Sequence, residues 1–139
     1  MSATNVFRLV ANQNSGWTMF GRVCSRNGSG TESPVPAEGF LVIPSDLSVV
    51  QVNVYDQMSS TPGTPIYTAN PTPSSVISST LQTGNVWTAI VGGGNFSFTF
   101  PANVFVLPAH DYLIVILFTT SGGETFSGQA YLKTQRVGP

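Results

Sequence analysis

Few side chains in this chain could carry out chemistry, and their spacing favours no particular reaction. His110 is the only histidine and is followed by Asp111. A serine hydrolase would add a nucleophilic serine to such a pair, but the Gly-x-Ser-x-Gly spacing of many hydrolases does not occur in the sequence. The sequence therefore predicts that His110 is a turn residue. Its replacement would remove the only candidate proton shuttle.

The acidic residues give only a weak signal of a site. The six carboxylates are scattered singly along the chain, whereas a metal site needs several His, Asp or Glu side chains that converge. Glu32 and Glu38 lie in one Pro-rich segment, and spacing alone does not exclude the two facing carboxylates of a glycosidase. We expect no catalytic residue, no metal, no cofactor and no enzymatic activity.

Two further motifs have structural explanations. Gly92-Gly93-Gly94 lacks the Lys-Ser/Thr that would follow in a P-loop and opens no helix, which indicates a flexible loop before the next strand. Cys24 is the only cysteine, so a disulfide within the chain and a cysteine-based metal site are both excluded. We expect Cys24 to be a small buried hydrophobic side chain.

The two tryptophans bear on sugar binding, because carbohydrate-binding modules present exposed aromatic platforms. Trp87 is most simply a residue of the core or of its edge. Trp17 lies near Met19 and Phe20, which favours packing within the domain or at a subunit contact. An exposed Trp17 or Trp87 would instead favour a carbohydrate- or cell-surface-binding module.

The low charge of the chain excludes some partners and favours others. Charged residues make up 8% of the chain and the net charge is -1, against roughly 25% charged residues in ordinary domains. Nucleic-acid binders neutralise phosphates with Lys and Arg, so that class is disfavoured. Low charge also weakens the usual protection against association. This favours a protein packed among neighbours in an assembly, as a homo-oligomer.

No segment predicts membrane insertion or secretion. The longest apolar run, Tyr112 to Phe118, has the length of a strand and is far shorter than the roughly eighteen residues of a membrane helix. Met1 to Val10 has no apolar core after a basic start, unlike a secretory signal. We expect a chain that is made in the cytoplasm and not secreted.

Strand signals dominate, and helical periodicity is nearly absent. Leu47 to Tyr55 alternates with three valines on one face, and Phe96 to Phe100 places three aromatic rings on one face. Tyr112 to Thr119 is apolar on both faces, which predicts a central strand covered on both sides. A hairpin turn at Ser121 to Glu124 leads into a return strand from Thr125 to Thr134.

Weaker strand signals complete the domain. They are Trp17 to Cys24, Gly39 to Ile43, Pro65 to Ala69 and Ser75 to Leu81. About seven strands with an N-terminal extension predict an all-β fold, an immunoglobulin-like or jelly-roll-like β-sandwich over residues 17–139. Periodicity does not show strand order, so both connectivities stay open.

Two segments lie outside the strand pattern. Residues 1–16 form an N-terminal arm with one apolar cluster, either a frayed terminus or edge strand of the same domain or an arm that adds a strand to a neighbouring subunit. Ser59 to Pro65 is a long connection or a contact loop. The candidate protein-contact residues are Val6, Phe7, Leu9, Trp17, Phe20, Thr61 and Pro62.

Two resemblances add expectations. The stretch from His110 to Ile116 resembles the start of strand F in immunoglobulin-like sandwiches, where a tyrosine, here Tyr112, hydrogen-bonds back to the chain. The cysteine pair and the tryptophan spacing of antibody domains are missing, so the resemblance implies only the general architecture.

The chain is also similar to a group of small uncharacterised proteins from phages and bacterial genomes, over roughly residues 17–134. The segments that carry the similarity are Val52 to Asp56, Ser75 to Ile77, Thr80 to Thr83, Val86 to Thr88, Gly94 to Phe96 and the Tyr112 strand with its Ser121-Gly122-Gly123 turn. The group commonly carries charges near the Leu-Gln-Thr and Asn-Phe segments, where this chain is neutral. That departure puts a shared partner surface in doubt.

The resemblance implies a structural virion protein of a tailed phage. We expect a head decoration (cement) protein, favoured as a trimer, that binds the major capsid protein or other virion proteins. A tail, neck or baseplate component is the close alternative, and a carbohydrate- or cell-surface-binding sandwich module is an alternative of a different class. A jelly-roll shell protein is disfavoured by the short chain and by the lack of a basic arm.

Overall fold

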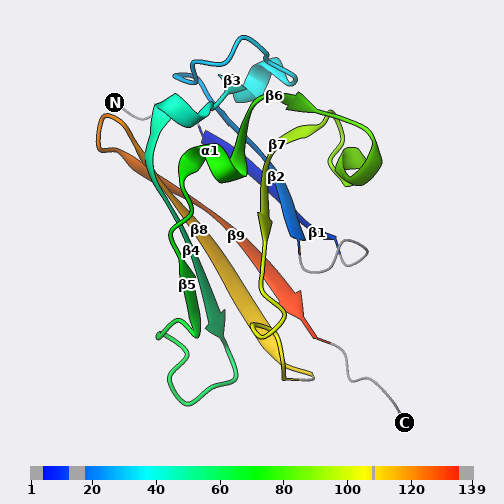
Figure 1. Cartoon of the computed structure of the whole chain (residues 1–139), viewed down its shortest axis with the longest axis vertical. Coiled ribbons are helices and arrows are strands. Elements are labelled where there is room, and N and C mark those ends of the chain that lie inside the picture. The colour runs from blue at the N-terminus through cyan, green and yellow to red at the C-terminus, as the bar shows by residue number, and fades with distance from the viewer. Residues whose placement is uncertain (1–4, 13–17, 108, 135–139) are drawn as a thin grey trace.

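The strand-forming segments pair into two antiparallel sheets that lie face to face in a computed structural model of the chain (Figure 1). The structure describes residues 5–12, by their backbone, and residues 18–107 and 109–134. The strands are β1 (Asn5–Asn12), β2 (Thr18–Ser25), β3 (Phe40–Leu41), β4 (Leu47–Asp56), β5 (Tyr67–Ala69), β6 (Ile77–Gln82), β7 (Gly94–Thr99), β8 (Asp111–Thr120) and β9 (Thr125–Lys133). Short helical turns are η1 (Pro36–Glu38), η2 (Pro44–Asp46), α1 (Pro73–Val76) and η3 (Asn85–Ala89).

The strand order identifies the type of sandwich. One sheet has the order β1-β2-β7-β6, with β3 also paired to β2, and the other has the order β5-β4-β8-β9. In immunoglobulin-like domains strands A, B, E and D form one sheet and C, F and G the other, with an additional strand beside C in some types. The order here is the same, so the predicted all-β sandwich is confirmed and its connectivity is immunoglobulin-like.

The core lies between the two sheets and follows the predicted alternation. Val52 and Val54 of β4 and Ile116 and Phe118 of β8 are completely buried. Phe118 meets Phe96 of the opposite sheet edge to face, with ring centroids 5.9 Å apart. Burying each such side chain stabilises the fold by about 1.5–3 kcal/mol. The period of two along β4 and β8 therefore directs these side chains into the space between the two sheets.

A chain of aromatic rings extends the core toward the end of the sandwich where β4 ends. Phe98, Phe100, Phe105 and Tyr112 pack edge to face in succession, with centroid distances of 4.9, 5.1 and 5.1 Å. Edge-to-face packing is favourable because the positive edge of one ring meets the negative face of the next. The three phenylalanines predicted on one face thus build a thick core, although β7 itself ends at Thr99.

The weaker strand predictions were only partly correct. β3 covers two residues of the predicted Gly39 to Ile43 strand, because Pro44 opens a helical turn directly after Ile43. Within Ser75 to Leu81, the first residues belong to α1, which begins at Pro73, and β6 starts at Ile77. Over the described part of the chain, no helix is long and apolar enough to span a membrane.

The segment predicted as an N-terminal arm contributes a strand to the chain's own sheet. β1 pairs with β2 along its whole length, from Asn5 opposite Ser25 to Asn12 opposite Thr18. It forms an outer edge of that sheet. The side chains of Val6, Phe7 and Leu9, and the whole of Trp17, lie outside the described residues.

One buried arginine connects β2 to two loops. The Arg22 side chain donates to Glu38 Oε1 over 3.0 Å and to the carbonyl oxygens of Val91 and Gly93 over 2.7 and 3.0 Å. Both Arg22 and Glu38 are buried. The glycine-rich segment that the sequence predicts as a flexible loop is therefore tied to the sheet by a charged group.

One buried asparagine joins β7, β2 and β3. Asn95 Oδ1 accepts from the Val23 N–H over 2.8 Å, and Nδ2 donates to the carbonyl oxygens of Val23 and Val42 over 3.3 and 2.8 Å. Asn95 is 0% exposed. Its amide supplies both a donor and an acceptor to the backbone of β2 and a donor to Val42, the residue that follows β3.

Cys24 is buried, as the sequence predicts, and we expect it to be chemically inert in the folded protein. It is 0% exposed, and burial raises the pKa of its thiol to about 11, while Arg22 lowers it and Glu38 raises it. At pH 8 only about one thiol in a thousand would be the reactive thiolate. Labelling with a thiol-specific disulfide reagent should be negligible in the native protein and complete after unfolding in urea. Rapid labelling of the native protein would contradict this prediction.

Candidate protein-contact surface

The sheet formed by β5, β4, β8 and β9 has a side directed away from the core, on which apolar residues remain partly exposed among the described residues. On β8 the residues alternate between buried and half-buried, so Leu113, Val115 and Leu117 point away from the core. The sequence predicts a strand covered on both sides. That prediction was wrong for the chain by itself, because these three side chains remain partly exposed. We call this side of the sheet the outer face.

Direct cross-strand pairing arranges the outer face in rows. Leu113 lies opposite Tyr55 of β4 on one side and Tyr131 of β9 on the other. Tyr131 is 77% exposed. Side chains directly opposite each other on one face are in contact range. A Tyr-Leu-Tyr row therefore crosses three strands at the end of the sheet where β4 finishes.

Uncharged amide side chains lie beside the apolar residues on the outer face. Thr68 donates to Asn53 over 2.8 Å, Asn53 donates to Gln51 over 3.1 Å, and Gln51 donates to Asn70 over 3.2 Å. This ladder runs over β5, β4 and the residue after β5. Depletion of charge together with exposed aromatic and aliphatic groups is typical of the centre of protein interfaces.

A shallow groove borders the apolar row. It has a volume of about 460 Å³ and is lined by Tyr55, Gln57, Pro62, Gly63, Leu113 and Val115. Pro62, one of the predicted contact residues, therefore lies beside the outer face. Thr61 precedes it in the same exposed loop, and neither residue is buried. Among the described residues, the predicted contact loop thus lies beside the partly exposed apolar side of the β5-β4-β8-β9 sheet.

Local hydrogen bonds give the contact loop a defined shape. The Asp56 carbonyl accepts from Ser59 over 3.2 Å, the Thr61 carbonyl accepts from Thr64 over 3.0 Å, and Val54 accepts from Ile66 over 2.7 Å. The Ser59 hydroxyl also accepts from the Thr61 N–H over 3.0 Å. Pro62 and Gly63 are the two central residues of the Thr61–Thr64 turn, and the fixed φ of proline suits the first of these positions. The loop is therefore two consecutive turns closed back onto β4.

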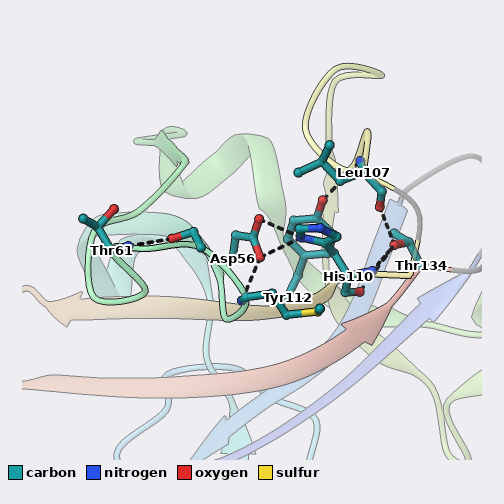
Figure 2. Close-up of polar contacts among 8 residues, drawn as sticks. Asp56, Thr61, Leu107, His110, Tyr112 and Thr134 are labelled. Atoms are coloured by element: carbon teal, nitrogen blue, oxygen red, sulfur yellow. Dashed lines mark hydrogen bonds and ion pairs between the residues drawn. The ribbon is translucent and has the colours of Figure 1, made fainter.

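A buried carboxylate anchors the base of this loop (Figure 2). Asp56, the last residue of β4, is 5% exposed. Its carboxylate accepts from the Met58 N–H over 2.9 Å and lies 3.0 Å from Nδ1 of His110 through each oxygen. An ionised carboxylate only accepts hydrogen bonds, so this contact places a proton on Nδ1. His110 thus joins the contact loop to the start of β8.

Tyr112 and Thr134 complete the same end of the sandwich (Figure 2). The Tyr112 hydroxyl accepts from the Leu107 N–H over 3.3 Å, which confirms the expected bond back to the chain. Burial raises the pKa of the Tyr112 hydroxyl, the Leu107 bond lowers it, and Asp56 raises it. The Thr134 hydroxyl donates to the Leu107 carbonyl over 2.6 Å and accepts from the His110 N–H over 3.0 Å.

Among the described residues, the hydrogen bonds of Asp56, His110, Tyr112 and Thr134 connect loops to strands, and none of them places a nucleophile on His110. A Ser-His-Asp hydrolase needs a hydroxyl on the second ring nitrogen of its histidine. Within residues 18–107 and 109–134, His110 bonds through Nδ1 and its backbone only. In that same part of the chain, no group of three or more His, Cys, Asp or Glu residues is placed to hold a metal ion.

The two neighbouring glutamates have separate partners. Glu38 pairs with Arg22, and Glu32 Oε2 accepts from the Leu81 N–H over 2.6 Å. Each carboxylate thereby holds a loop against the β1-β2-β7-β6 sheet. A pair of catalytic carboxylates would instead face one another across a substrate cleft.

The aromatic residues near β2 pack within the chain. Phe20 is buried and meets Trp87 edge to face with centroids 4.9 Å apart. Trp87 is half-buried in η3 and packs against Phe20, outside the main core cluster. Phe20 packs against Trp87 and is not part of the outer face.

Sequence reasoning missed the pairing of Asp56 with His110, whose positions are far apart in the chain. A signal was nevertheless present. Asp56 continues the even-numbered positions Val50, Val52 and Val54 that form the buried face of β4. A carboxylate at a core position requires a partner, and His110 is the only histidine.

Comparisons of the chain with known protein families, with curated proteins and with solved structures give no match.

Proposed function

We propose that the chain is a structural assembly protein of a tailed-phage virion, a head decoration protein that binds the capsid lattice through its outer face. The observation that carries the proposal is the uncharged apolar row of Tyr55, Leu113 and Tyr131, with the groove beside it. The virion setting rests on the sequence resemblance to small phage proteins alone.

The composition supports the same proposal. The chain has 8% charged residues, and apart from the exposed pair of Asp111 and Lys133 at its end the outer face has amide and hydroxyl groups as its hydrogen-bonded polar side chains. Such groups are desolvated at lower cost than charges. An exposed surface of this kind is suited to remain permanently covered in a stable complex.

The mechanism that we propose is mechanical. Tyr55 and Tyr131 would insert amphipathic rings between neighbouring capsid subunits, with their hydroxyls at the wetter rim of the contact. Pro62 and Gly63 would close the groove over a partner segment. Contacts that bridge two subunits raise the free energy needed to separate them, so the bound protein would resist expansion or rupture of the lattice. A trimer would present three copies of the face to a local three-fold axis.

A tail, neck or baseplate component could use the same face, and co-sedimentation separates these positions. Purified protein would be centrifuged with heads, with tails and with empty expanded capsids of the phage that encodes the chain. Stoichiometric binding to expanded heads in hundreds of copies would support decoration. Binding only to tails, or a few copies at one vertex, would overturn it. Binding to neither particle but to a glycan array would favour the carbohydrate-binding alternative.

Replacing Val115 with lysine tests whether the outer face makes the contact. The residue is half-buried at the centre of the face, so a charge there would weaken particle binding by at least about tenfold through desolvation. Val91→Lys is the matched control, because Val91 is 89% exposed on the loop after η3. Circular dichroism melting would show that both variants fold. Equal binding of the two variants would contradict the proposed contact.

A further inference from the structure

A second pocket lies at the opposite end of the sandwich from the groove. It has a volume of about 340 Å³, and its lining residues come from the segment between β2 and β4 and from the turn that joins β8 to β9. Leu47 at the start of β4 lines this pocket, whereas Tyr55 near the end of β4 lines the groove. Eight strand residues separate the two sites by roughly 25 Å. The pocket is therefore independent of the outer-face contact.

The floor of the pocket is apolar and fixed. It is formed by Val42 and Leu47, which are buried, and by Phe126. The Phe126 ring stacks on Phe118 with centroids 4.9 Å apart and an interplanar angle of 18°. Because Phe118 is part of the main core, the position of the Phe126 ring is set by the sandwich itself. A flat ring with aliphatic neighbours suits the alkyl stem or the planar head of a long side chain.

The rim of the pocket is negatively charged. Its charged members are Asp46 and Glu124, and no Lys, Arg or His lines the pocket in the described part of the chain. Serine and threonine hydroxyls, including those of Ser45 and Ser121, add further hydrogen-bond acceptors. A carboxylate-lined pocket with an apolar floor discriminates in favour of cations that carry a hydrocarbon chain.

The two carboxylates differ in how firmly they are held. Asp46 Oδ2 accepts from the N–H groups of Ser29 and Ile43, and Oδ1 accepts from the Ser29 hydroxyl. This fixes the carboxylate while Oδ1 retains acceptor capacity. Glu124 is held through its backbone, which exchanges hydrogen bonds with Thr120. Within the described residues, its exposed carboxylate makes no hydrogen bond or ion pair.

From this arrangement we infer that the pocket binds a guanidinium group on an alkyl chain, the arginine side chain of a partner protein. The guanidinium is planar and has five N–H donors, which match one fixed carboxylate, one free carboxylate and the surrounding hydroxyl oxygens. Its alkyl stem would lie over Leu47 and Val42, and its plane would lie against Phe126. The inference does not rest on the virion function, because any basic partner segment would be recognised in this way.

The test is an amide chemical-shift titration of the full-length protein with Nα-acetyl-arginine methylamide. The amides of residues 121–125 and of Ser29 should shift, and the binding should weaken with added salt. Glu124→Gln, which keeps the shape of the side chain, should weaken binding about fivefold. Asp111→Asn is the matched control, since Asp111 is an exposed carboxylate at the other end of β8, and it should leave binding unchanged.

Further probes decide the class of the ligand. The citrulline analogue has the same shape without the charge, and equal binding of it would overturn the inference. Shifts at the same amides with methyl glucoside and none with the arginine derivative would assign the pocket to a sugar instead. If agmatine binds more than about tenfold tighter than the arginine derivative, the ligand is a free alkylguanidine, and the inference of a partner protein's arginine is overturned. No shift at the pocket with any probe would also overturn it.

Discussion

Arg22→Met should destabilise the fold by about 3–5 kcal/mol, the cost of breaking a buried ion pair by removing one of its members. The methionine preserves most of the apolar stem, so the loss is electrostatic. Glu38 would lose its contact with the Arg22 cation, and the carbonyl oxygens of Val91 and Gly93 would lose the Arg22 donor. Out of a total stability of about 5–15 kcal/mol, this loss is large enough to leave a substantial unfolded population.

Urea unfolding followed by tryptophan fluorescence would measure this effect as a fall in the midpoint with an unchanged slope. Arg26→Met is the control, because Arg26 is exposed four residues further on, and it should change stability by less than about 0.5 kcal/mol. The double variant Arg22→Met/Glu38→Gln should recover part of the lost free energy of unfolding, since it also removes the buried negative charge of Glu38. If Arg22→Met lowers the free energy of unfolding no more than Arg26→Met does, the Arg22–Glu38 pair makes no net contribution to stability.

Asn95→Asp should cost about 2–5 kcal/mol, although it changes only one atom of the side chain. The carboxylate can still accept from the Val23 N–H, but it cannot donate to Val42. It would instead place a negative charge against two carbonyl oxygens in a site that is 0% exposed. Asn95→Ala should give a loss in the same range, because the Val23 N–H and the Val42 carbonyl would both lose this partner.

Thermal melting compares these variants with Asn70→Ala, which removes an exposed amide from the edge of the outer face. The control should melt within a few degrees of the parent protein. Hydrogen exchange at the Val23 amide should accelerate strongly in Asn95→Ala. Unchanged protection of that amide would mean that Asn95 does not hold β2 to β7 in the way that its hydrogen bonds imply.

The strands that pack in the core could be predicted because apolar residues recur at every second position, which identifies the buried face of a strand. β4 and β8 were found nearly to the residue from alternating Val and from the run after Tyr112. The prediction that β8 is covered on both sides was wrong because of the apolar residues on its outer side. Apolar side chains indicate that a face is unfavourable in water, but they do not show whether the same chain or another protein covers it. Leu113 and Val115 are half-buried in the isolated chain, and this discrepancy identifies the candidate contact surface.

The polar contacts were beyond prediction because they depend on tertiary distance. Arg22 meets Glu38 and the Val91 carbonyl across loops whose paths no local pattern determines. Asp56 and His110 meet because β4 ends where β8 begins, which only the pairing register shows. Proline positions explain the short β3 and the turn α1, but their effect on neighbouring strands was underestimated. Ser59 to Pro65 does connect two strands, β4 and β5, and its contact role stays a prediction, while the surface it borders was not foreseen.

The burial of Asn95 also restricts where the chain can be made. Asn95-Phe96-Ser97 is an acceptor sequence for N-linked glycosylation. A sugar attached to Asn95 during translocation would modify the amide that donates to Val23 and Val42. The folded core has no space for it, since Asn95 and Phe96 are both 0% exposed. Production through a eukaryotic secretory pathway would therefore trap the chain unfolded, unless Ser97 were first replaced by alanine.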